Sequence, residues 1–163
     1  MNIITLPHQL KTVLCFYGAS NAVTCDTVSL KNVQKGWWMI HHDGATDVDL
    51  VLTTTQCTDV ASATNKATSA VHRIWRDIAP GTTSDTLTEL TAAASMTIDP
   101  ATMNPVLAII EIDPDIHLDR EGGYDCAYLA DSGGSAADTV AIYFLALMKN
   151  QGKGALTASL ITD

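Results

Sequence analysis

Residues 113–121 carry carboxylates at a spacing that could bind a divalent cation. The oxygen ligands come at alternate positions and belong to Asp113, Asp115, Asp119 and Glu121. Oxygen is the ligand that Ca²⁺ prefers, but the stretch lacks the central glycine and closing glutamate of an EF-hand loop. Ile116 and Leu118 alternate as at the edge of a sheet, where charges discourage stray strand pairing. We therefore predict an acidic sheet edge here and no metal ligand.

Two adjacent histidines, His41 and His42, followed by Asp43, form a second candidate metal site. Neighbouring residues of a strand point to opposite faces of the sheet. The two imidazole rings could therefore not easily share one ion, and we predict no metal ligand here.

Residues 131–135 read Asp-Ser-Gly-Gly-Ser and contain the string that surrounds the nucleophile of chymotrypsin-like serine proteases. A catalytic triad needs a histidine beside the serine and a buried carboxylate that orients it. Such proteases carry that histidine in an Ala-Ala-His-Cys context, whereas His41 and His42 follow Met-Ile and precede Asp-Gly. The chain is also short for a two-barrel protease. We predict a polar loop, and we expect replacement of Ser132 by Ala to change nothing.

Four cysteines, Cys15, Cys25, Cys57 and Cys126, are far apart in the sequence. They form no Cys-x-x-Cys pair, so neither a zinc knuckle nor a redox motif is present. We interpret them as free thiols made in a reducing cytoplasm, while the even count leaves disulfides open.

Three tryptophans, Trp37, Trp38 and Trp75, could line a sugar or peptide groove. We predict that two of them lie in the core and that at most one anchors an interface. The chain contains no Walker loop, no dinucleotide fingerprint and no His-Glu-x-x-His motif. We accordingly assign no catalytic, cofactor-binding or metal-binding residue and predict that the protein is not an enzyme.

Charge and composition limit the kinds of partner that we expect the protein to bind. The 163 residues include nine basic and eighteen acidic side chains, which gives a formal net charge of −9. A nucleic-acid backbone or an anionic membrane would repel such a surface, so we expect neither as a partner. No run approaches the ~20 apolar residues of a spanning helix, and the apolar stretch before residue 20 has poor signal-peptide flanks. We expect a soluble protein.

The elements that position these groups are short stretches with a period of two, which is typical of strands. The strands we expect are 12–17, 27–33, 37–42, 47–53, 71–78, 106–112, 124–130 and 140–148. A turn at 43–44 predicts a hairpin between the third and fourth. Tyr124, Cys126 and Tyr128 are expected on one face. Residues 59–70 read as a surface loop, residues 82–97 fit a strand or a short helix, and for 140–148 we favour a strand over a helix.

Roughly eight strands without alternating helices predict an all-β fold, an antiparallel β-sandwich or jelly-roll-like single domain. We expect an extended N-terminal arm over 1–22, the sandwich domain over 23–150 and a C-terminal arm over 151–163.

Taken together, the chain resembles small structural proteins of tailed bacteriophages that are encoded beside the major capsid protein and attach to the head as decoration or cement proteins. The resemblance covers most of the chain at the level of pattern. It rests on four places. The first is residues 28–32, which lead into an aromatic strand, and the second is residues 50–52 and 56–59, which precede the loop with 66–67. The third is the strand 110–113, which is followed after a loop by 123–125, and the fourth is the apolar last strand with the arm that ends in 161–163.

The resemblance implies a virion structural protein, made in the host cytoplasm, that binds the outer surface of the capsid and stabilises it as a homo-oligomer. Its partners would be the major capsid protein and copies of itself, with one of the two arms touching the shell. A carbohydrate- or receptor-binding sandwich, using a tryptophan and the Asp-rich loop, is the alternative from another class. A tail or neck component of the same virion is a third possibility.

Overall fold

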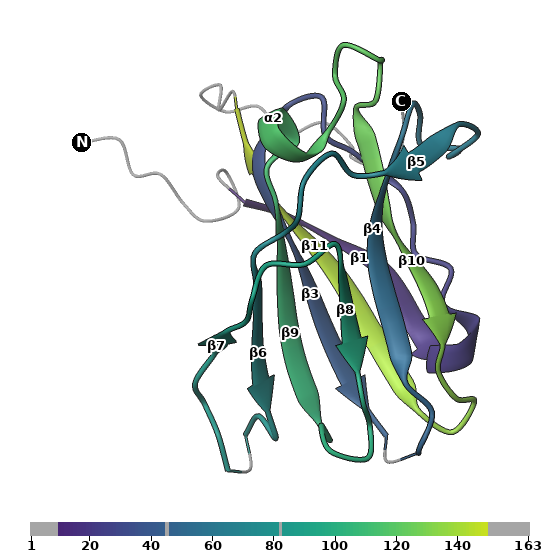
Figure 1. The fold of residues 1–163 in the computed structure, drawn as a ribbon, viewed down its shortest axis with the longest axis vertical. Coiled ribbons are helices and arrows are strands. Elements are labelled where there is room, and N and C mark those ends of the chain that lie inside the picture. The colour runs from purple at the N-terminus through teal and green to yellow at the C-terminus, as the bar shows by residue number, and fades with distance from the viewer. Residues whose placement is uncertain (1–9, 45, 82, 150–163) are drawn as a thin grey trace.

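The most apolar run of the chain, Thr139–Met148 (β11), is a strand inside the larger of two sheets (Figure 1). The computed structural model describes residues 10–44, 46–81 and 83–149. The first sheet contains, in spatial order, β1 (Leu10–Ala19), β11, β3 (Val33–Asp43), β9 (Val106–Ile112), β6 (Ile74–Ile78) and β7 (Thr88–Glu89). All of its strand pairs are antiparallel.

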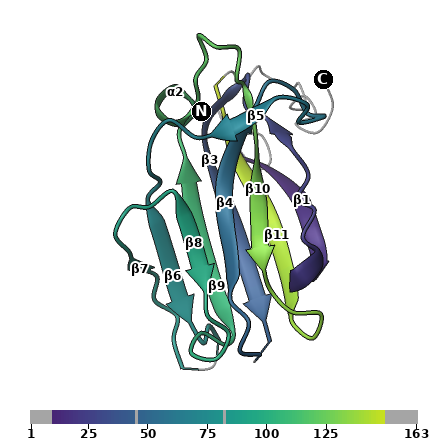
Figure 2. The same ribbon diagram turned by 45° about the vertical axis from the view of Figure 1, so that its right-hand side comes forward.

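The second sheet packs on one face of the first (Figure 2). It contains β2 (Val28–Ser29), β10 (Cys126–Gly133), β4 (Leu50–Cys57), β5 (Asn65–Ala67) and β8 (Ser95–Ile98). Both β5 and β8 pair with β4, along different halves of that strand. Two short helices, η1 (Ser20–Ala22) and α2 (Pro114–His117), complete the described elements. The architecture confirms the predicted all-β antiparallel sandwich.

The core lies between the sheets and is filled by every second residue of the long strands. Trp38 of β3 and Phe144 of β11 are fully buried there, with ring centroids 4.5 Å apart. Inward-facing Val, Ile and Leu side chains surround them. Burial of each such side chain contributes about 1.5–3 kcal/mol, so this layer supplies most of the driving force for folding.

The predicted hairpin between residues 36–44 and the following strand is wrong. β3 belongs to the first sheet, where β11 and β9 flank it, and β4 belongs to the second sheet. The Asp43-Gly44 turn therefore carries the chain from one sheet to the other. A turn signal predicts that the chain reverses but not which strand it will pair with, because pairing is set by burial against the rest of the fold.

Residues 126–129 of β10 alternate between the two faces of the strand, with Cys126 and Tyr128 together on one face as predicted. Ala127 and Leu129 are the side chains that enter the core, while Tyr128 is half-buried on the outer face. Aromatic residues dominate a hydrophobicity pattern, whereas alanine is a weak signal although it fits a tight position between sheets. Of the three tryptophans, only Trp38 is fully buried, so one tryptophan lies in the core and not the two that were predicted.

Several boundaries also differ from those predicted. Residues 82–97 contribute two short strands, β7 and the start of β8, and the surface loop 59–70 contains β5. The strand predicted at 12–17 is longer, since β1 begins at Leu10 and pairs along its length with β11. Residues Leu10–Ala19 of the predicted N-terminal arm thus belong to the first sheet. Residues 1–9 and the predicted C-terminal arm 151–163 lie outside the described residues.

Candidate functional site

The outer face of the first sheet carries a row of apolar side chains that crosses five strands. Strand register places them side by side, in the order Leu14, Tyr143, Met39, Ile109 and Trp75. Leu14 is 53% exposed and Tyr143 39% exposed, and the other three are half-buried. We call this set the apolar row.

Neighbouring registers extend the apolar surface on both sides of the row. Leu145 lies beside Trp37 on one side, and Tyr17, which is 72% exposed, lies beside Ala141 on the other. Sheets with apolar residues on both faces are usually covered on both faces. A contiguous exposed apolar patch of this kind marks a site of protein interaction.

Charged side chains border the apolar row at its β9 and β6 ends. Glu111 accepts hydrogen bonds from Lys35 Nζ at 3.2 Å and from the Trp37 indole N–H at 3.3 Å. Arg73 pairs with Glu89 at 2.9 Å and its guanidinium stacks 4.7 Å from the Trp75 ring centre. An apolar centre with a polar rim is the usual anatomy of a protein interface.

The strand β1 forms one edge of the first sheet (Figures 1 and 2). No other strand of this sheet pairs with it on the side away from β11 among the described residues, and its Cys15 carbonyl accepts a 3.0 Å hydrogen bond from the Asp26 N–H. Leu14 and Tyr17 sit on this same strand. The edge and the apolar row therefore form one continuous surface.

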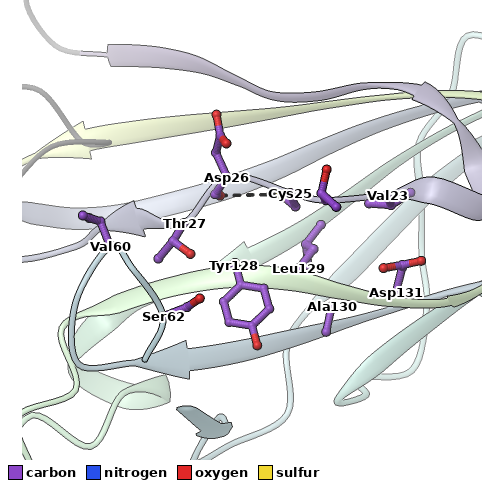
Figure 3. A pocket seen from close by; sticks show the side chains of 11 residues that line it. Val23, Cys25, Asp26, Thr27, Val60, Ser62, Tyr128, Leu129, Ala130 and Asp131 are labelled. Atoms are coloured by element: carbon purple, nitrogen blue, oxygen red, sulfur yellow. Dashed lines mark hydrogen bonds between the residues drawn. The ribbon is translucent and has the colours of Figure 1, made fainter. Parts of the chain in front are cut away.

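A separate groove of about 530 Å³ lies on the second sheet (Figure 3). Residues 23–27 run alongside β10 on one side, and Val60 and Ser62 close one end. Tyr128 and Asp131 of β10 and Asp26 are among the residues that line it. The volume falls in the range of small-ligand sites, and the lining mixes one aromatic ring with carboxylates and hydroxyls.

The Asp-rich stretch is ordered by its own ion pairs rather than by convergence on one point. Asp113 caps α2 by accepting a 3.1 Å hydrogen bond from the Asp115 N–H, as expected of an Asp-Pro helix start. Asp115 pairs with Lys149 at 3.0 Å, and Asp119 pairs with Lys66. Three of the four carboxylates thus have different partners, and the part of the chain described here contains no group of three His, Cys, Asp or Glu that could hold a metal ion.

The residues of the protease-like string are not brought to a histidine. Ser132 is exposed near the end of β10 and lies opposite Val51 of β4. His41 is exposed and His42 is fully buried, so the two rings point to opposite faces as predicted. The buried His42 Nε2 lies 3.8 Å from an oxygen of buried Asp138, a pair that sequence spacing did not suggest.

The two glycines of that string instead shape a turn. Gly133 has a φ of +84°, and the Gly134 N–H donates to the Asp49 carbonyl at 2.7 Å. The Ser20 hydroxyl bonds both the N–H and the C=O of Ser135, at 2.8 and 3.0 Å. The turn therefore joins the end of β10 to the start of β4 and to η1.

We expect Gly133→Ala to lower the free energy of unfolding by about 2 kcal/mol. An added Cβ would strain the positive φ and would also press on the Asp49 carbonyl oxygen. Gly123→Ala is the matched control, because Gly123 has a φ of +81° but open space where a Cβ would lie. Urea denaturation should show a loss of about 1 kcal/mol in the free energy of unfolding for the control. Equal losses in the two variants would contradict the proposed contact between the added Cβ and the Asp49 carbonyl.

Comparison with protein-family models, with curated proteins and with solved structures finds no match to this chain. No helix in the described ranges is long and apolar enough to cross a membrane. Function is therefore inferred from the fold and its surfaces. The sequence patterns missed the apolar row because each strand taken alone offers only one or two of its members. The continuous apolar character of residues 106–112 and 140–148 was the signal that could have revealed it.

Proposed function

We propose that this protein is a structural subunit of a virion, a decoration protein that binds the outer surface of a phage head. The observation that supports the role of an assembly subunit is the apolar row, which extends to the edge strand β1. The phage head as partner comes from the resemblance of the sequence to decoration proteins. An exposed apolar face that extends to an edge strand suits lasting contact with neighbouring subunits.

Repetition strengthens such a contact. A shell offers many equivalent positions, and an oligomer that touches several of them at once binds by avidity. Apolar burial at each position then needs to contribute only modestly. The proposal thus assigns the outer face of the first sheet to the capsid lattice or to neighbouring copies of the protein.

We expect Tyr143→Asp to reduce retention on purified heads by more than tenfold, because a buried unpaired carboxylate at the centre of an apolar interface is costly. Tyr143 points outward and is 39% exposed, so the fold should tolerate the change. Heads stripped of the protein are mixed with each variant, sedimented, and the bound fraction is measured. Ser132→Asp, on the exposed end of β10, is the matched control.

Two outcomes would separate the alternatives. Retention of Tyr143→Asp at the level of the unmodified protein would refute the role of the apolar row. Deletion of residues 150–163 in parallel tests whether the predicted C-terminal arm makes the shell contact instead. Imaging of intact particles distinguishes a head position from a tail or neck position.

The groove on the second sheet favours a second candidate, a carbohydrate- or receptor-binding function. Tyr128 contributes an aromatic ring to the lining of the groove, and Asp26, Asp131 and Thr27 contribute two carboxylates and a hydroxyl. The alternative site of a tryptophan with the Asp-rich loop is less favoured, because the carboxylates of that loop are engaged by Lys66 and Lys149. Glycan-array binding that is lost in Tyr128→Ala would support the groove, and an array without signal would remove it.

A further inference from the structure

The four cysteines, dispersed in sequence, lie as two pairs in the fold. Cys57 of β4 and Cys126 of β10 are register partners on neighbouring antiparallel strands. Cys25 lies between η1 and β2, and the backbone of its neighbour Asp26 is hydrogen-bonded to Cys15 of β1. All four are free thiols in this structure.

A backbone hydrogen bond holds the chain next to Cys25 beside Cys15. The Asp26 N–H donates to the Cys15 carbonyl at 3.0 Å, which draws the segment after Cys25 alongside β1 as in a strand pair. Adjacent strands place opposed Cα atoms roughly 4.5–5.5 Å apart, within the range of about 4.4–6.8 Å that disulfides span. Cys15 also stands at the register shift between Leu14 and Phe16, where a bulge redirects a side chain.

The two pairs differ in access from solvent. Cys25 is half-exposed and lines the groove of Figure 3, with Cys15 almost fully buried at 3% exposure. Cys57 and Cys126 are both completely buried. The neighbouring Cys25 thiol, and then burial, raise the pKa of Cys15, so Cys25 is the first of the two thiols to react with the oxidant.

We propose that Cys15 and Cys25 form a dithiol site that closes to a disulfide by exchange with a small-molecule disulfide such as oxidised glutathione, while Cys57 and Cys126 stay reduced in the folded protein. The Cys25 thiolate attacks one sulfur of the oxidant and displaces one glutathione thiolate. Cys15 then loses its proton to water as its sulfur attacks Cys25 Sγ and displaces the second glutathione. The two cysteine protons pass through water to the two glutathiones, so one disulfide is reduced as one is formed.

The disulfide would covalently link an edge of the first sheet to the segment that leads into an edge of the second. Cys15 belongs to the edge strand of the first sheet, and Cys25 leads into β2, the edge strand of the second. The bond would stabilise the fold by constraining the unfolded chain. We expect the oxidised protein to melt roughly 6–12 °C above the reduced one. This proposal stands independently of the proposed virion role.

The sequence allows a direct test by peptide mapping. Trypsin cleaves after Lys11 and Lys31, so Cys15 and Cys25 fall on one peptide, 12–31, whereas Cys57 and Cys126 fall on the separate peptides 36–66 and 121–149. The folded protein is incubated with oxidised glutathione, its remaining thiols are alkylated, and the digest is analysed by mass spectrometry. We expect peptide 12–31 to be lighter by two hydrogen atoms and free of alkylation, with the other two peptides alkylated.

Variants identify the order of attack. Cys15→Ser should trap glutathione on Cys25, and Cys25→Ser should leave peptide 12–31 free of glutathione and abolish the melting difference. Cys57→Ser is the matched control and should oxidise at 12–31 as the unmodified protein does. Alkylation of both cysteines of 12–31 after oxidation, or a linkage of 36–66 to 121–149 formed first in the folded protein, would overturn the proposal.

Discussion

Trp38→Ala is expected to lower the free energy of unfolding by about 3–5 kcal/mol, the largest loss that we expect of any single substitution discussed for this protein. Trp38 is fully buried between the sheets and packs its ring against Phe144, with centroids 4.5 Å apart and planes tilted by 51°. Truncation removes the apolar transfer energy of an indole and leaves a cavity that two rigid sheets cannot close. Such a loss is a large share of the stability of about 5–15 kcal/mol that is usual for a domain.

The adjacent residue provides the matched control for this prediction. Trp37 lies on the opposite face of β3, where it is half-buried and donates its indole N–H to Glu111. Urea denaturation of Trp37→Ala should show a loss of about 1 kcal/mol, because little cavity forms on an open face. The same pair of variants tests the register of β3, since a shift by one residue would exchange the two results. A smaller loss for Trp38→Ala than for Trp37→Ala would contradict the fold.

Lowering the pH is expected to destabilise the protein already at pH values above those at which carboxylates titrate. Burial lowers the pKa of His72 to about 4. Its ring is fully buried, lies 4.3 Å from the parallel ring of His117, and bonds the Glu111 carbonyl and the Thr68 hydroxyl, both at 2.9 Å. Because a carbonyl only accepts, Nδ1 carries the proton of the neutral ring and Nε2 accepts from Thr68. Burial lowers the pKa of His42 as well.

The direction of the pH effect follows from where the proton binds first. The unfolded chain takes up a proton on His72 near its ordinary pKa of about 6.5, whereas the folded protein does so only near about 4. The stabilisation is therefore complete above the unfolded pKa and is lost as the pH falls from there to about 4. We expect protonation of His72 to lower the free energy of unfolding by about 2 kcal/mol between pH 7 and pH 5, and by about 3 kcal/mol between pH 7 and pH 4.

Urea denaturation at pH 7, 6 and 5 measures this dependence. His72→Gln should be less stable than the unmodified protein at pH 7 but should lose less stability on acidification, because one titrating group is gone. His41→Gln alters an exposed ring and should keep the steep dependence. An equal slope in His72→Gln and in the unmodified protein would show that His72 does not carry the effect.

Local patterns along the chain predicted several strands correctly. Val106–Ile112 and Thr139–Met148 are strands, and Leu50 and Leu52 face the core as their alternation indicates. The opposed faces of His41 and His42 were predicted from strand geometry alone. These features depend on the period of two in a strand, which is a property of neighbouring residues.

The errors all concern long-range partners. The Asp43-Gly44 turn was assigned to a hairpin, although it joins the two sheets. Two tryptophans were expected in the core, although only Trp38 is fully buried there. In both cases the local signal was compatible with two arrangements, and packing against distant strands selected one of them.

The amino-acid sequence by itself determined the fold class, the absence of recognisable catalytic motifs and the acidic balance of −9, because these depend on composition and on spacing between near neighbours. Only the tertiary structure decided which residues meet. It assembled the apolar row from five strands, formed the groove between residues 23–27 and β10, and brought Cys15 to Cys25 and Cys57 to Cys126. The physical reason is that strand pairing joins residues far apart in the chain, in an order set by the burial of the whole core.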